Sequence, residues 1–521
     1  MEVKSNDLFF RIWAGVGLIA FFIVWNLPWR FQVNDDLIMM WLVSGAYTGT
    51  PESYAVFIHP LLSWGFSKAY SVAPDIPWYS LTWFSVLFLS YFLILKKVER
   101  IDSNLLWKHL FSGFILILVI NFCFFLQFTI VAGFASLAGL LILDRNKDFY
   151  SKPVIILGWI LIFFSLMVRW ESMVLIGLGF FLFNVLYISK PEFKSAFRMF
   201  SLLAIVFGLA IGSKYYWEIN SEYSEFLAFN KARAAVIDHP VFYERIKSGK
   251  IEEGSSMFYF ARWMFEDEKI SISELEVQKQ ELDADLFSFK QVVNSFERFV
   301  SVQKMEAFKS SLSILLVLIS LIYCRSKKRI LAFLGLWLLF MLFANHFFIL
   351  NGRVTILFFL VFLFPILNSS KFPHHRLSIF VGAYIILLGL FAYHFFNFME
   401  EARGREIMHQ EFESLRKRIP EKEVILLEGY MEHNFYFDYS VRNQVPILSL
   451  GWISRSPFQK KAMAKFGLSG LVDAENYWLF GIRQQRESLY FPEYMNSISG
   501  PFELRQGIES PNFVLLRFSK K

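Results

Sequence analysis

The sequence predicts a polytopic α-helical membrane protein that carries a small α/β domain at its C-terminal end. Hydrophobic residues make up 55% of the 521 residues, and 63 residues are phenylalanine, which is more apolar bulk than a soluble core of this length needs. Charged residues make up 19% of the chain and are clustered between apolar runs instead of being scattered. Both observations favour long apolar helices that alternate with polar loops.

The apolar runs set the number of predicted membrane spans. A hydrocarbon layer about 30 Å thick takes about twenty helical residues to cross, and about eleven runs approach that length. The first covers residues 9–27, and the others are centred near Val86, Leu116, Ala135, Ile160, Leu178, Val206, Leu316, Leu336, Leu360 and Leu387. The first run is too long for the apolar part of a signal peptide and no small-residue cleavage site follows it, so we expect an uncleaved anchor.

Basic runs between the spans predict the orientation. If the N-terminus is cytoplasmic, five segments rich in lysine and arginine face the cytoplasm, in agreement with the positive-inside rule. These segments are residues 96–108, 144–152, 190–198, 325–329 and 371–376. Such loops explain the formal charge of +7, so no nucleic-acid partner is expected. The predicted location is the inner (plasma) membrane, with residues 28–77, 214–308 and 398–521 on the extracytoplasmic side.

The polar tail predicts a separate domain. Three strand-like runs lie at residues 424–427, 445–448 and 513–518. Because polar helical stretches alternate with them, we expect a transmembrane module over residues 1–397 and an extracytoplasmic α/β domain over residues 398–521. The two cysteines, Cys123 and Cys324, fall inside apolar runs and are predicted to be core residues.

The first loop after the opening span carries two adjacent carboxylates, Asp35 and Asp36. An ordinary interpretation is a helix cap or a solvated loop, since aspartate is favoured at helix N-termini. The neighbouring residues make a cap or a solvated loop less favoured as the explanation, because the pair opens an amphipathic stretch over residues 37–47. Thr48-Gly49-Thr50-Pro51 follows, and then His59-Pro60-Leu61-Leu62.

This arrangement resembles the first outer loop of the GT-C superfamily of polyprenyl-phosphate-sugar-dependent membrane glycosyltransferases, particularly the protein mannosyltransferase and aminoarabinose transferase group. Asp35 and Asp36 match the acidic pair of that group. The group also has a basic residue followed by Pro-Pro-Leu; here His59 stands for the usual lysine and Leu61 for the second proline. The resemblance covers the topology, the first loop and the outer C-terminal domain, and it implies a GT-C-like fold of a bacterial branch.

The resemblance implies an inverting glycosyltransferase. It would take a sugar from a polyprenyl-phosphate donor at the extracytoplasmic face and pass it to a glycan, lipid or protein acceptor. Asp36 or Asp35 would accept the proton of the acceptor hydroxyl, a role worth on the order of 10² to 10⁴ in rate, while the other aspartate orients it or raises its pKa. The same pair offers oxygen ligands to a divalent cation, although the motifs require no cofactor.

A lipid phosphate as leaving group needs cationic donors, and arginine offers the best geometry. The candidate substrate-binding residues are His59, Arg169, Glu171, Arg233 and Arg353. Each has a structural alternative. Arg169 can simply pair with Glu171, and Arg353 can extend toward lipid headgroups. Arg233 fits a solvated helix face, and His59 fits a helix cap or a packing role.

Two other functions stay open. A polysaccharide polymerase or ligase also acts on lipid-linked glycans outside the cell, and arginines would then dominate its site. A transporter or flippase for a lipid-linked glycan belongs to a different class. Transporters usually place ionisable residues near the middle of their spans and often show repeat symmetry, and neither feature is evident in the sequence.

Overall fold

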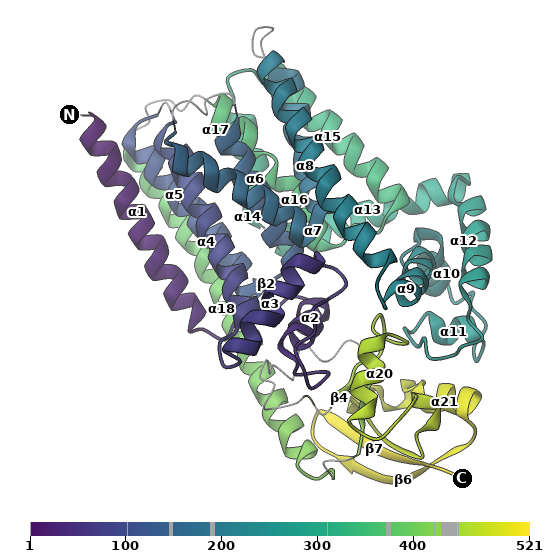
Figure 1. The fold of residues 1–521 in the computed structure, drawn as a ribbon. Coiled ribbons are helices and arrows are strands. Elements are labelled where there is room, and N and C mark those ends of the chain that lie inside the picture. The colour runs from purple at the N-terminus through teal and green to yellow at the C-terminus, as the bar shows by residue number, and fades with distance from the viewer. Residues whose placement is uncertain are drawn as a thin grey trace.

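The computed structural model describes residues 2–101, 103–144, 150–187, 193–309, 311–370, 377–420, 423–428, 445 and 447–521. Long helices form a bundle, and a group of shorter helices and a sheet-containing C-terminal domain lie together at one end of it (Figure 1). The shorter helices follow α8 (Phe193–Ile219), and the C-terminal domain follows α18 (Leu377–Arg416).

The described residues contain eight helical segments that are long and apolar enough to cross a membrane. They are α1 (Glu2–Trp25), α4 (Trp78–Glu99), α5 (Leu105–Phe124), α7 (Lys152–Tyr187), α8, α15 (Lys327–Phe347), α16 (Gly352–Leu360) together with α17 (Leu363–Ser369), and α18. Two shorter apolar helices are α6 (Phe128–Leu143) and α14 (Ser311–Tyr323). The predicted class of helical membrane protein is confirmed. The predicted runs map onto these helices when α7 is counted once on each side of Arg169, but the number of spans stays a prediction.

The centre of the bundle is α6, because all of its residues are buried. A helix that is hydrophobic on every side is stable only when other helices surround it. Gly139 lets α6 approach α7 closely, since a side-chain carbon there would lie 2.7 Å from the Gly158 carbonyl oxygen. Apolar side chains on α1 and α18, such as Phe22 and Ile385, are exposed on the outside of the bundle, as expected of helices that face lipid.

The first loop is tied to the bundle by a short parallel pairing between β1 (Arg30–Phe31) and β2 (Phe125–Leu126). The next helix, α2 (Asn34–Ser44), is buried on nearly every side. Residues 37–47, which the sequence analysis describes as an amphipathic stretch, are therefore buried on both faces. The reason is tertiary, because the C-terminal domain covers this part of the loop: the Val445 N–H donates to the Ala46 carbonyl at 2.9 Å.

The segment between α8 and α14, called here the long segment, forms a small core of its own over its described residues. Its helices are α9 (Ser224–Ile237), α10 (Pro240–Lys247), α11 (Ser256–Phe260), α12 (Ile272–Leu286) and α13 (Phe289–Lys309). Pro240 opens α10 and His239 caps it, an arrangement that starts a helix without wasting a backbone donor. The long segment is thus an ordered body, and α9 within it carries Arg233.

The C-terminal domain contains a five-stranded sheet in the order β4-β3-β5-β7-β6. The strands are β3 (Ile425–Leu427), β4 (Ile447–Leu448), β5 (Asn476–Ile482), β6 (Phe502–Glu509) and β7 (Phe513–Lys520), accompanied by α20 (Pro457–Ala464) and α21 (Phe491–Ser499). β4, β3 and β5 are parallel, whereas β7 runs antiparallel to both β5 and β6. The three predicted strands are confirmed as β3, β4 and β7. The preceding α18 is 40 residues long and runs through the predicted boundary at residue 398.

Two further sequence predictions can be compared with the structure. Cys123 and Cys324 are both buried and free, which confirms their assignment to the core. Of the predicted cytoplasmic segments, residues 371–376 lie outside the described residues. The same holds for residue 102, residues 145–149 and residues 190–192 within three other segments. The side of the membrane on which each loop lies stays a prediction.

Candidate functional site

The two neighbouring aspartates have opposite environments. Asp36 has no exposed surface, and its carboxyl group accepts hydrogen bonds from the Tyr79 hydroxyl (2.9 Å) and the Phe128 N–H (3.3 Å). Burial raises the pKa of Asp36 to about 8, against the lowering effect of those two hydrogen bonds. Asp36 is therefore largely protonated at neutral pH, and in this conformation a substrate cannot touch it.

Asp35 remains accessible, and it pairs with an arginine from a distant part of the chain. The Arg353 Nη1 lies 3.2 Å from Asp35 Oδ2, and the two side chains are 27% and 18% exposed. The residues are 318 positions apart in the sequence. Arg353 sits in the first turn of α16, where the helix dipole disfavours a cation, so its place there calls for an anion. Asp35 supplies that anion here, and a phosphate has the charge to do the same.

Arg169 lies at a break in α7. Its backbone is extended (φ −156°, ψ 91°), and this divides the helix into two halves. Its Nε pairs with Glu171 at 3.2 Å, so the structural contact considered for these two residues is present. The guanidinium also lies 5.6 Å from the centre of the Phe128 ring, and Phe128 is the residue whose N–H binds Asp36. Arg169 and Asp36 thus contact the same residue, Phe128.

Asp238, at the end of α9, belongs to the same electrostatic environment. Its side chain is exposed to solvent, yet the surrounding protein raises its pKa through desolvation. The positive charges of Arg233, Arg353 and Arg169 act in the opposite direction. The sequence analysis missed Asp238, although a carboxylate at the C-terminal end of a helix, where the dipole disfavours it, is a usable signal. We call Asp35, Arg169, Asp238 and Arg353 the charged cluster.

Two predicted binding residues have structural roles instead. The imidazole of His59 caps α3 (Pro60–Val72), because its Nδ1 accepts the Leu61 N–H at 3.1 Å. Its Nε2 lies 3.2 Å from both the Ala210 carbonyl and the Ser213 hydroxyl, and burial lowers its pKa. Capping was one of the two roles considered for His59, and both ring nitrogens already have partners.

Arg233 is buried in the long segment and does not lie on a solvated helix face. Only 4% of it is exposed. Its Nε and Nη2 donate to Asn230 Oδ1 at 3.1 and 2.6 Å, and its guanidinium lies about 5 Å from the rings of Trp263 and Phe265. Arg233 also acts on the charged cluster, because its positive charge lowers the pKa of Asp238.

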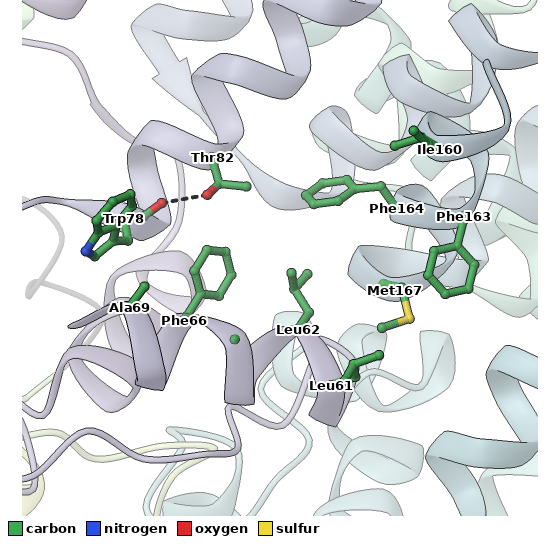
Figure 2. A pocket seen from close by; sticks show the side chains of 11 residues that line it. Leu61, Leu62, Phe66, Ala69, Trp78, Thr82, Ile160, Phe163, Phe164 and Met167 are labelled. Atoms are coloured by element: carbon green, nitrogen blue, oxygen red, sulfur yellow. Dashed lines mark hydrogen bonds between the residues drawn. The ribbon is translucent and has the colours of Figure 1, made fainter. Parts of the chain in front are cut away.

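An apolar cavity of about 410 Å³ lies between α3, α4 and the first half of α7 (Figure 2). Its lining residues are Leu61, Leu62, Gly65, Phe66, Ala69, Trp78, Thr82, Ile160, Phe163, Phe164 and Met167. Figure 2 shows Leu62, Phe66 and Phe164 pointing toward one another across it. The Thr82 hydroxyl donates to the Trp78 carbonyl at 2.7 Å, so this polar group is already bonded within α4. An apolar ligand in the cavity would therefore leave the Thr82 hydroxyl hydrogen-bonded.

The cavity and the charged cluster adjoin one another at the break in α7. Met167 lines the cavity, and Arg169 follows it directly after Val168 in α7. The His59 N–H donates to the Met167 carbonyl at 2.7 Å, and Leu61 on the cavity wall comes two residues after His59. An amphipathic ligand could therefore place its apolar part in the cavity and its anionic part against Arg169.

The C-terminal domain packs on the first loop and on the long segment. The Trp452 ring lies 4.8 Å from that of Phe57, which in turn lies 6.4 Å from Phe128. An ion pair between Lys461 and Glu52 adds a 2.9 Å contact. The Arg455 guanidinium lies 4.0 Å from the Phe229 ring of α9. The domain thus contacts residues on two sides of the charged cluster.

Strained backbone is concentrated at this junction. Among the residues that the structure describes, three non-glycine residues adopt left-handed conformations: Val56 (φ 63°), Trp263 (φ 64°) and Arg455 (φ 64°). They belong to the first loop, the long segment and the C-terminal domain. A β-branched residue such as Val56 rarely adopts this conformation, which costs on the order of 1–3 kcal/mol. Such strain persists where the surrounding structure holds it, and it is typical of functional sites.

Within the described residues, no group of three or more histidine, cysteine, aspartate or glutamate side chains could hold a metal ion, so the predicted divalent-cation site stays a prediction. Asp35 and Asp238 are the carboxylates of the charged cluster that could contribute to one. Comparisons of the chain with protein-family models, with curated proteins and with solved structures find no match.

Proposed function

We propose that this protein is an inverting membrane glycosyltransferase of the GT-C type that uses a polyprenyl-phosphate sugar. The observation that carries the proposal is the pairing of Asp35 with Arg353 at 3.2 Å, because it brings together a carboxylate that would act as the base and a cation that would bind phosphate, 318 residues apart in the sequence. Arg169 lies nearby and adjoins the apolar cavity. These are the groups that a lipid-phosphate donor and a hydroxyl acceptor would need.

The reaction assigns a separate role to each charge. The acceptor oxygen would bond to the anomeric carbon while the bond from that carbon to the phosphate oxygen breaks. The acceptor proton would go to Asp35, and the electron pair would leave with the polyprenyl phosphate. Arg353 and Arg169 would stabilise the charge on the departing phosphate, as preorganised cationic donors do. Because the phosphate would compete for Arg353, donor binding would also release Asp35 to act as the base.

The geometry favours Asp35 over Asp36 as the base. A general base must come within hydrogen-bond reach of the proton that it accepts, and Asp36 is wholly buried. A carboxyl group with a pKa of about 8 is also mostly protonated at pH 7. Asp36 would instead hold the start of α2 against Tyr79 and Phe128 and so position Asp35.

The apolar cavity would hold the first part of the polyprenyl chain. Its volume of about 410 Å³ is within the usual range for small-molecule sites, about 300–1,000 Å³. Leu61 and Trp64 on α3 are more than half exposed, so an apolar surface continues from the cavity to the outside of the bundle. A lipid tail could enter there without crossing the charged cluster.

Mass spectrometry of cell-envelope glycans, glycolipids and glycoproteins tests the proposal. Cells that lack the protein would be complemented at equal expression level with the native chain, Asp35→Asn, Asp36→Asn or Asp285→Asn. The last variant removes an exposed ion pair with Arg245 in the long segment and serves as the control. We expect one defined sugar to disappear and to return with the native chain and the control but not with Asp35→Asn.

The other outcomes separate the alternatives. Full restoration by Asp35→Asn, together with failure of Arg353→Ala and Arg169→Ala, would favour a polymerase or ligase centred on arginines. Accumulation of an unchanged lipid-linked glycan on the inner face would favour a transporter. If Asp36→Asn were the one aspartate variant that failed to restore the sugar, Asp36 would be the base. This outcome would contradict the division of roles proposed above.

A further inference from the structure

In α13, a helix of the long segment, polar residues face the protein interior and apolar residues face outward, which is the reverse of the usual arrangement. Its polar residues Gln291, Ser295 and Arg298 are buried, whereas four apolar residues in its first two turns are exposed. These residues are Phe289 (85%), Val292 (50%), Val293 (40%) and Phe296 (60%). A helix in water buries its apolar face, so this arrangement implies that the medium outside α13 is not water.

Hydrogen bonds and an ion pair hold the buried polar face in place, so the reversal is part of the fold. The Arg298 Nη2 donates to the Asn345 carbonyl at 2.6 Å, and the Asn345 side-chain amide donates to the Ser295 carbonyl at 2.7 Å. The Ser295 hydroxyl lies 2.9 Å from His346 Nδ1. Arg298 also pairs with Glu244 of α10 at 3.4 Å. Rotating α13 to bury its phenylalanines would break all of these interactions.

The adjacent helix α12 shows the ordinary pattern. Leu275, Leu282 and Leu286 are buried, while Glu274 and Glu276 are exposed. The two helices are joined by Phe287 and Ser288, so they share a segment and a neighbourhood. The contrast indicates that α12 faces water and that α13 faces a different medium.

The exposed face of α13 continues the lipid-facing surface of the bundle. The Phe287 ring lies 6.0 Å from Phe347, which lies 4.8 Å from Phe343. Phe343 and Leu339 are both more than 60% exposed on α15, a candidate membrane span. Figure 1 shows α13 beside the end of α15. Contacts through Phe287 and Phe347 thus join the start of α13 to the exposed apolar surface of α15.

We propose that α13 lies in the bilayer interface, with Phe289, Val292, Val293 and Phe296 inserted among the acyl chains of the leaflet on the charged-cluster side. An amphipathic helix of this kind lies in the membrane plane with its apolar face buried in lipid. The contact ties the long segment, and with it Asp238, to a constant height above the bilayer. This inference does not depend on the reaction that the protein catalyses.

Fluorescence quenching in lipid vesicles tests the proposal. Single cysteines replace Val293 and Phe296 on α13, and Val277→Cys on α12 is the matched control because Val277 is a similarly exposed valine. Cys123 and Cys324 are buried, so labelling of the unmodified protein gives the background. The full-length protein is labelled in detergent with an environment-sensitive fluorophore and reconstituted into phosphatidylcholine–phosphatidylglycerol vesicles. Spin-labelled lipid and iodide, present on both sides, are compared as quenchers.

Lipid quenching of the α13 labels should exceed that of the α12 label by at least about threefold, and iodide quenching should show the opposite order. Equal iodide quenching at positions 293 and 277 would overturn the proposal. Protection from both quenchers would also overturn it, because it would mean that a protein, such as a second copy of the chain, covers the face. If Val293→Cys does not yield folded protein, Val292→Cys on the same face replaces it.

Discussion

The two halves of the candidate site are built from different parts of the chain. The apolar cavity is lined by residues 61–82 and 160–167 of α3, α4 and α7, all within the N-terminal third of the chain. The charged cluster draws on α2, α7, α9 and α16 and depends on a pair 318 residues apart. The cavity needs only the correct packing of neighbouring helices, whereas the cluster needs the whole fold. Substitutions should therefore damage the charged cluster more severely than the cavity.

The largest expected effect is on Arg353. Arg353→Ala removes the cation that would stabilise the departing phosphate, so the transfer rate should fall by about 10² to 10³. Arg353→Lys keeps the charge but loses the two-pronged geometry and should be intermediate. The measurement is the rate of sugar transfer in membranes that contain equal amounts of each variant. Arg245→Ala, which removes an exposed arginine, is the control, and an equal loss there would mean that the effect is not local.

A smaller effect is expected when the cavity is filled. Gly65 lines the cavity, and a side-chain carbon added there would meet nothing within 4 Å, so Gly65→Leu should fold normally. It should raise the KM for the lipid donor about tenfold and leave kcat nearly unchanged, since it would remove binding common to the ground and transition states. Gly177→Leu in the second half of α7 is a matched change, because Gly177 also has open space around it. If Gly65→Leu and the native protein had a similar KM for the lipid donor, the cavity would not be part of the donor-binding site.

The protonation of Asp36 predicts a pH effect on stability. Its pKa in the folded protein, about 8, lies above the ordinary value of 3.8. Between these values the folded protein holds a proton that the unfolded chain has released, so this group makes stability fall as pH rises from about 4 to about 8. Asp36→Asn cannot titrate, and its Tm should therefore fall by a few degrees less than that of the native protein between pH 6 and pH 8. Parallel Tm curves would contradict the burial of a protonated Asp36.

The smallest expected effect concerns the strained turn between the two regions. Glycine tolerates the left-handed backbone at Val56 and alanine does not, so Val56→Gly should be more stable than Val56→Ala by about 1 kcal/mol. At Val43 inside α2 the order should reverse, because glycine costs a helix about 1 kcal/mol relative to alanine. Thermal unfolding of the four variants in detergent measures both differences. The same order at both positions would mean that Val56 is not strained.

Most of the features that the sequence predicted correctly depend on composition or on short stretches of the chain. The membrane class, the strands β3, β4 and β7 and the Arg169–Glu171 contact depend on composition or on residues close in sequence. The burial of Asp36 and Arg233 could not be predicted in this way, because it depends on Tyr79, Phe128 and Trp263 packing against them. The place of Asp238 in the charged cluster could not be predicted, because Asp35, Arg169 and Arg353 lie on three other segments.

The sequence by itself determined that this chain folds as a bundle of apolar helices with a small α/β domain, because hydrophobic periodicity and run length act within single elements. The tertiary structure alone decided that Asp35 faces Arg353 while Asp36 is buried, since that choice depends on contacts between distant segments. It also decided which way α13 is turned. An amphipathic pattern shows that a helix has two faces, but only its neighbours determine whether the apolar face meets protein or lipid.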